Sequence, residues 1–132
     1  MESFKLTGNE GIRVIFDRRQ FTEDKWLESY FIKIEGKGMS AEVKVDNPPY
    51  GNSPLSLFNE MNDSWSGWEK NKTWGAMEGE FNLSASYGSG GHVQLAIEID
   101  NQYLNWLTCA YIAIEAGQLE NIARQAKAFF IC

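Results

Sequence analysis

The chain has 132 residues, of which 43% are hydrophobic and 23% are charged. A chain of this length and composition can bury a core without disulfides or a structural metal. Twelve Lys and Arg against 18 Asp and Glu give a formal charge of -6, which disfavours binding to nucleic acids and to anionic membranes. The sequence begins without a signal-peptide pattern and holds no apolar run near the about 20 residues of a membrane span. We therefore expect a single cytoplasmic domain over residues 1–132, with no nucleic acid and no membrane as partner.

Alternating apolar and polar side chains predict strands in the first part of the chain. Three runs show this period of two: Ile12, Val14 and Phe16; Tyr30, Ile32 and Ile34; and Met39, Ala41, Val43 and Val45. The Glu35–Gly38 segment predicts a turn between the second and third runs. This hairpin would set Ile34 opposite Met39 and Ile32 opposite Ala41.

A helix is expected at about Pro54–Ser66. Ser53 offers an N-cap and Pro54 fits the first helical position. One helical face would carry Leu57, Phe58, Met61 and Trp65, so we expect Trp65 to be buried. The loop that follows holds Trp68 and Trp74, which either cap the core or form an exposed stacking platform for a sugar, a base or a protein.

Two alternating sets around Gly88–Gly91 predict a second hairpin, with Phe81 opposite Ile99 and Tyr87 opposite Val93. A one-residue slip would turn one of these strands inside out. The next segment, Trp106–Glu115, is apolar on both faces, which is typical of a central strand. Pairing it through a loop at residues 101–105 would set Cys109 opposite Ile97 on the apolar face.

The C-terminal segment predicts an amphipathic helix after Gly117, because its apolar residues recur at helical spacing: Leu119, Ile122, Ala123, Ala126, Phe129 and Phe130. Strands, a helix, three strands and a closing helix indicate the α+β class. We expect an antiparallel sheet of about six to seven strands packed with two helices.

No catalytic constellation is found in the sequence. Gly88–Gly91 lacks the spacing of a dinucleotide fingerprint or a P-loop, so a hairpin turn is favoured there. The single histidine, His92, cannot build a multi-histidine metal site, and the register places Cys109 beyond its reach. We therefore expect no catalytic residue, no metal, no cofactor and no disulfide.

Four carboxylates are expected at one end of the second hairpin. Its register sets Glu80 opposite Asp100 and Asn82 opposite Glu98, with Glu78 one step further along. Like charges that face each other across strands are destabilising. Their repulsion must therefore be offset by a basic protein partner, by a divalent cation or simply by solvation. The candidate binding residues are Glu78, Glu80, Glu98, Asp100, Trp68, Trp74 and His92.

Several pieces of the second half together resemble a family of small uncharacterised bacterial proteins. They are Trp65-Ser66-Gly67-Trp68, Trp74, Glu78-Gly79-Glu80-Phe81 and Gly91-His92-Val93-Gln94-Leu95. Like that family, the chain ends in a Trp-containing strand and a helix of the Gly117–Glu120 type. The resemblance implies a bacterial source and no known activity, and it carries over no catalytic residue.

Acidic charge, abundant aromatic residues and the lack of an assembled nucleophile favour a non-enzymatic binding protein. By analogy of size and charge, we expect an immunity-type inhibitor that neutralises a bacterial toxin. The alternative is a small enzyme or ligand-binding domain that uses carboxylates and the Trp cluster.

Overall fold

The structure is a computed structural model that describes residues 2–8, 10–48 and 52–131. In these ranges the strands of the first sheet are β1 (Phe4–Thr7), β2 (Arg13–Phe21), β3 (Leu27–Gly36) and β4 (Met39–Asp46). Those of the second are β5 (Lys72–Gly75), β6 (Phe81–Tyr87), β7 (His92–Asn101) and β8 (Trp106–Glu115). The helices are α1 (Leu55–Asp63) and α2 (Leu119–Phe130), with short 3₁₀ turns at Ser89–Gly91 and Ala116–Gln118.

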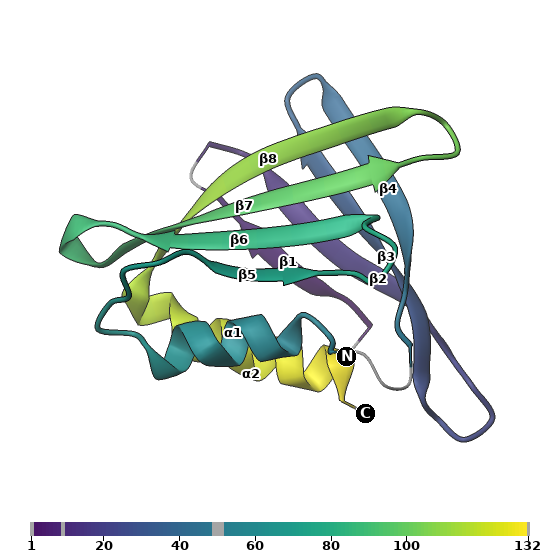
Figure 1. Cartoon of the computed structure of the whole chain (residues 1–132), viewed down its shortest axis with the longest axis horizontal. Coiled ribbons are helices and arrows are strands. Elements are labelled where there is room, and N and C mark those ends of the chain that lie inside the picture. The colour runs from purple at the N-terminus through teal and green to yellow at the C-terminus, as the bar shows by residue number, and fades with distance from the viewer. Residues whose placement is uncertain (1, 9, 49–51, 132) are drawn as a thin grey trace.

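Both sheets are antiparallel and four-stranded, in the orders β1-β2-β3-β4 and β5-β6-β7-β8. The second sheet crosses in front of the first, and the two helices run side by side below them (Figure 1). There α1 contacts β5 and α2 contacts β1, so the helices close one side of the space between the sheets. The predicted α+β class is confirmed, with eight strands in the described residues.

A cluster of aromatic rings joins the sheets to the helices. The ring of Phe16 on β2 lies 5.1 Å from that of Phe4, 5.7 Å from Phe81 on the second sheet and 5.8 Å from Phe130 on α2. All four side chains are buried. Because aromatic rings bring large apolar areas, this cluster contributes much of the contact between the layers. The amphipathic helix predicted at the C-terminus is confirmed, although Ile122 is only partly buried.

Hairpin registers follow the hydrophobic pattern where only one face is apolar. Phe81 faces Ile99 and Tyr87 faces Val93, as predicted. In the first sheet, Ile34 faces Ala41 and not Met39. The turn there has only two residues between β3 and β4, Lys37 and Gly38, and Gly38 has the positive φ of +73° that such tight turns require. A shift of two positions leaves every side chain on its predicted face.

The predicted register of Trp106–Glu115 was wrong by one residue. Ala110 faces Ile97, whereas Cys109 faces Glu98 on the outer surface and is exposed. The connecting loop has four residues, because Asn101 already pairs with Trp106. The strand β8 is also not central, since it is the last strand of its sheet. Hydrophobicity could not decide between its two faces, because both are apolar.

Helix α1 ends at Asp63, before Trp65, which is 63% exposed. The predicted burial of Trp65 was therefore wrong. It assumed that the helix continues to Trp65, which would have placed this residue on the same face as Leu57, Phe58 and Met61. No helix within the described ranges is long and apolar enough to cross a membrane.

Candidate functional site

An acidic cleft lies where the end of β4 meets the start of β6 and the end of β7. Asp46 is the last residue of β4, and Glu78 and Glu80 precede β6. One carboxylate oxygen from each of the three lies within 4.8 Å of the other two. The cleft has a volume of about 330 Å³, and its walls also include Asp100 at the end of β7 and Tyr103 in the turn that follows.

Glu80 is the least solvated member of the acidic cleft. Its Oε1 atom is buried and has no hydrogen-bond partner within the described part of the chain. Burial raises the pKa of the Glu80 carboxyl, and the charges of Asp46 and Glu78 add to the rise. Backbone N–H groups of Glu80 and Asp46 act in the opposite direction and lower the pKa. The cleft therefore holds negative charge that its own surroundings stabilise only in part.

The positive charges near the acidic cleft do not neutralise its carboxylates. Lys44 lines the cleft, but in residues 2–8, 10–48 and 52–131 none of Asp46, Glu78, Glu80 and Asp100 forms an ion pair. Tyr103, at the rim, is 97% exposed. An exposed aromatic ring beside such carboxylates is suited to a cationic group, which both can attract.

The four carboxylates expected from the sequence are divided between two surfaces. Glu78, Glu80 and Asp100 line the acidic cleft, whereas Glu98 lies on the outer face of the second sheet beside Cys109 and Tyr111. There its Oε1 accepts a hydrogen bond of 3.4 Å from Asn82 Nδ2. Sequence reasoning missed Asp46, because it belongs to the other sheet. Its position at the end of an alternating run was the available signal, but only the packing of the sheets brings it to Glu80.

Trp68 and Trp74 do not form an exposed stacking platform. Trp68 packs edge-on against Tyr87, and its Nε1 donates to the Ala85 carbonyl at 3.1 Å. Trp74 belongs to β5, not to a loop, and its ring lies 5.3 Å from that of Phe81. Both rings are partly buried against the core, as the capping alternative predicted.

His92 is the first residue of β7, and its Nδ1 lies 3.0 Å from Glu115 Oε1 on the exposed surface. Cys109 faces Glu98, six positions along β7 from His92. At about 3.3 Å per residue this separation is about 20 Å, far beyond the reach of a nucleophile and its base. The two residues therefore do not form a catalytic dyad.

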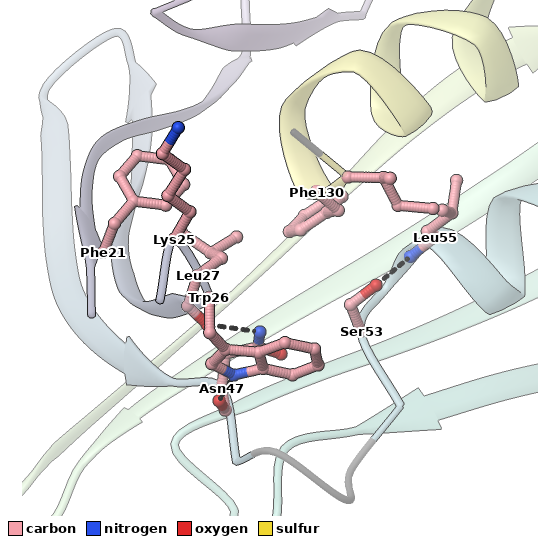
Figure 2. Close-up of a pocket in the computed structure, with 9 residues that line it drawn as sticks. Phe21, Lys25, Trp26, Leu27, Asn47, Ser53, Leu55 and Phe130 are labelled. Carbon is pink, nitrogen blue, oxygen red and sulfur yellow. Dashed lines mark hydrogen bonds between the residues drawn. The ribbon is translucent and has the colours of Figure 1, made fainter. Parts of the chain in front are cut away.

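A second concave site, the aromatic pocket, was not predicted from the sequence (Figure 2). It lies between the turn that joins β2 to β3 and the end of α2, and has a volume of about 390 Å³. Its lining residues are Phe21, Lys25, Trp26, Leu27, Asn47, Ser53, Leu55, Phe130 and Ile131. Two aromatic residues close to the Thr22–Lys25 turn were the signal in the sequence that could have indicated it.

The polar groups of the aromatic pocket are largely engaged in holding its walls. Trp26 Nε1 donates to the Asn47 carbonyl at 3.1 Å, and Asn47 Nδ2 donates to the Leu27 carbonyl at 2.6 Å. The Leu55 N–H donates to Ser53 Oγ (Figure 2). What remains is mainly an apolar surface with the Lys25 side chain at its edge, which can accept an apolar group but directs it weakly.

Comparison with known proteins identifies a family. A model described as "Family of unknown function (DUF6228)" matches residues 5–131. The chain belongs to this family. The resemblance to an uncharacterised family is thus confirmed, and it extends from the second half to nearly the whole chain. No curated protein matches this DUF6228 member at a significant level.

Among solved structures, WHY1 from Arabidopsis thaliana is similar to this DUF6228 member, with a TM-score of 0.50. The match covers 96% of this chain and 86% of the WHY1 chain, at 11% sequence identity. At such an identity, the likeness shows a shared fold and nothing about function.

Proposed function

We propose that this DUF6228 member is a non-enzymatic binding protein whose acidic cleft receives a lysine or arginine side chain of a basic partner protein. The observation that carries the proposal is the gathering of Asp46, at the end of β4, with Glu78 and Glu80, in the connection between β5 and β6. Their carboxylate oxygens lie within 4.8 Å of one another, and none of the three has an ion-pair partner in the described residues. A cationic side chain entering the cleft would supply that missing charge.

Three properties of the acidic cleft support a side chain as its occupant. Its volume of about 330 Å³ admits a long side chain, and its walls include Val43 and the ring of Tyr103 as well as carboxylates. The stem of a lysine or arginine is apolar, so it suits such walls while the charged head meets the acids. The net charge of -6 favours the approach of a basic protein. An immunity-type inhibitor of a basic toxin is the form of this function that we favour.

Binding of a basic probe tests the proposal. Fluorescence anisotropy would follow a labelled hexa-arginine peptide, with a hexa-glutamate peptide as the negative probe. The Asp46→Asn/Glu80→Gln double variant removes two charges with little change in shape. We expect it to bind hexa-arginine at least about tenfold more weakly, and binding by the wild type to weaken as salt rises.

The matched control is Glu60→Gln/Glu120→Gln, which removes the same charge from the exposed surfaces of the two helices. We expect this control to change the affinity by less than about twofold. Equal losses in both double variants would mean that only net charge matters, and would overturn the cleft as the site. A rise in melting temperature with calcium or magnesium that the cleft variant abolishes would instead assign the cleft to a metal ion.

A further inference from the structure

The outer face of β8 is the most apolar exposed surface of the second sheet. Leu107 and Tyr111 are each 56% exposed and lie on this face with Cys109. The turn before the strand adds Tyr103 and Leu104, which are 97% and 70% exposed. Large apolar side chains gathered on one exposed element are typical of an interaction surface.

The backbone of β8 is also open along one side. Within the described residues its only sheet neighbour is β7, so no strand pairs with its other edge. Gly8, which follows β1, lies close to Ile112 in the second half of β8. Protein edges are usually protected by charged residues or proline, but Trp106–Ile114 contains neither. The strand therefore has the composition of a central strand and the position of an edge strand.

We propose that β8 pairs antiparallel with β8 of a second copy of this chain, about a two-fold axis at Ala110. The two second sheets would then join into one continuous sheet. This pairing gives β8 the second neighbour that its composition predicts, and it removes the unprotected edge.

The sequence of β8 is complementary to itself in this register. On the outer face, Leu107 would lie opposite Ala113 of the second copy and Cys109 opposite Tyr111, so each large side chain meets a smaller one. On the inner face, Thr108 would lie opposite Ile112. No charged residue is opposed to another, because Glu115 would face Asn105. Pairing of two copies in this register therefore brings no like charges together along β8.

The mass in solution tests the proposal first. Sedimentation at about 100 μM should give twice the 15.0 kDa of one chain. The Leu107→Lys and Tyr111→Lys variants should sediment as monomers, while circular dichroism stays unchanged. The lysine introduced at position 107 would put a charge in place of the apolar contact with Ala113 of the second copy, and the two lysines introduced at position 111 would lie only two residues apart diagonally. Trp65→Lys is the matched control, since it adds the same charge at another exposed residue, and it should remain dimeric.

Cross-linking tests the register. With Cys132→Ser in every variant, Tyr111→Cys would set its new thiol directly opposite the native Cys109 of the second copy, and mild oxidation should yield a covalent dimer. Adding Cys109→Ser leaves only the introduced thiol at position 111 in each copy. These two thiols would be offset diagonally by two residues, which is too far for a disulfide.

Two kinds of result would contradict this pairing. A wild-type monomer at this concentration, or a dimer that both lysine variants leave intact, would overturn the proposal. A covalent dimer that forms only in the Cys109→Ser control would overturn the register.

Discussion

Carboxylate oxygens of Asp46 and Glu80 lie within 4.8 Å of each other, although Asp46 belongs to the first sheet and Glu80 lies in the connection between two strands of the second. Asp46 ends β4 and Glu80 lies just before β6, so the way in which the sheets cross decides this contact. Two negative groups held together by the fold repel each other unless a proton, a cation or water intervenes. The acidic cleft is therefore a place where stability and binding are coupled.

We first predict that Glu80→Gln stabilises the protein at pH 7. The folded-state pKa of Glu80 is raised, chiefly by burial, so the folded protein binds a proton more tightly than the unfolded chain does. Its ionisation therefore costs stability as pH rises above the ordinary value of 4.5, and the cost is absent well below it. Urea unfolding should show a larger free energy for Glu80→Gln at pH 7 and no difference at about pH 3.5.

The control for this pH dependence is Glu98→Gln, which removes a carboxylate from the outer face of the same sheet. Its effect on the free energy of unfolding should be smaller at pH 7. A Glu80→Gln variant that is less stable than the wild type at pH 7 would contradict the prediction, and would mean that the ionised carboxylate is stabilised in the cleft.

The second prediction concerns the aromatic core. Phe130→Ala should lower the free energy of unfolding by about 3 to 5 kcal/mol, because it leaves a cavity among packed rings. The Phe130 ring lies 5.3 Å from that of Tyr30 and 5.0 Å from that of Phe129. The neighbouring Ile131 is 59% exposed, so Ile131→Ala should cost less than about 1 kcal/mol. Urea unfolding measures both, and equal losses would indicate that the end of α2 is not packed as described.

The third prediction concerns the wall of the aromatic pocket. Asn47 Nδ2 donates a hydrogen bond to the Leu27 carbonyl in a buried position. Asn47→Ala leaves that carbonyl without its donor, and should cost about 1 to 3 kcal/mol in the free energy of unfolding. Asn121→Ala serves as the control, since the Asn121 side chain accepts a hydrogen bond from Arg124 on the exposed surface of α2. A loss in the control as large as that of Asn47→Ala would argue against a specific role for the buried bond.

The fourth prediction uses Trp65 as a probe of exposure. Trp65 is 63% exposed, whereas Trp68 and Trp74 are packed against the core. Trp65→Phe should therefore remove a large part of the fluorescence that acrylamide quenches readily, and should change stability by less than about 0.5 kcal/mol. Trp74→Phe is the comparison, and its loss should leave the readily quenched fraction nearly unchanged. The reverse result would place Trp65 in the core.

The alternation of apolar and polar residues along the sequence determined which face of most strands is buried. In the Phe81–Ile99 pairing, polar residues occupy one face of each strand, so a one-residue slip would expose one apolar set and bury its polar neighbours. The same reasoning identified α2, where apolar residues recur at helical spacing along the whole helix. Local patterns suffice in these cases because a single face must be buried.

Only the tertiary structure decided the short strands, the register of β8 and the composition of the acidic cleft. The strands β1 and β5 have four residues each, which is too few to establish a period. In β8 both faces are apolar, so the hydrophobic pattern is compatible with burial of either face. In the folded chain the buried face is the one that carries Ala110, Ile112 and Ile114. Asp46 reaches Glu80 only because two sheets cross, and no local pattern encodes a distance between residues that far apart in the chain.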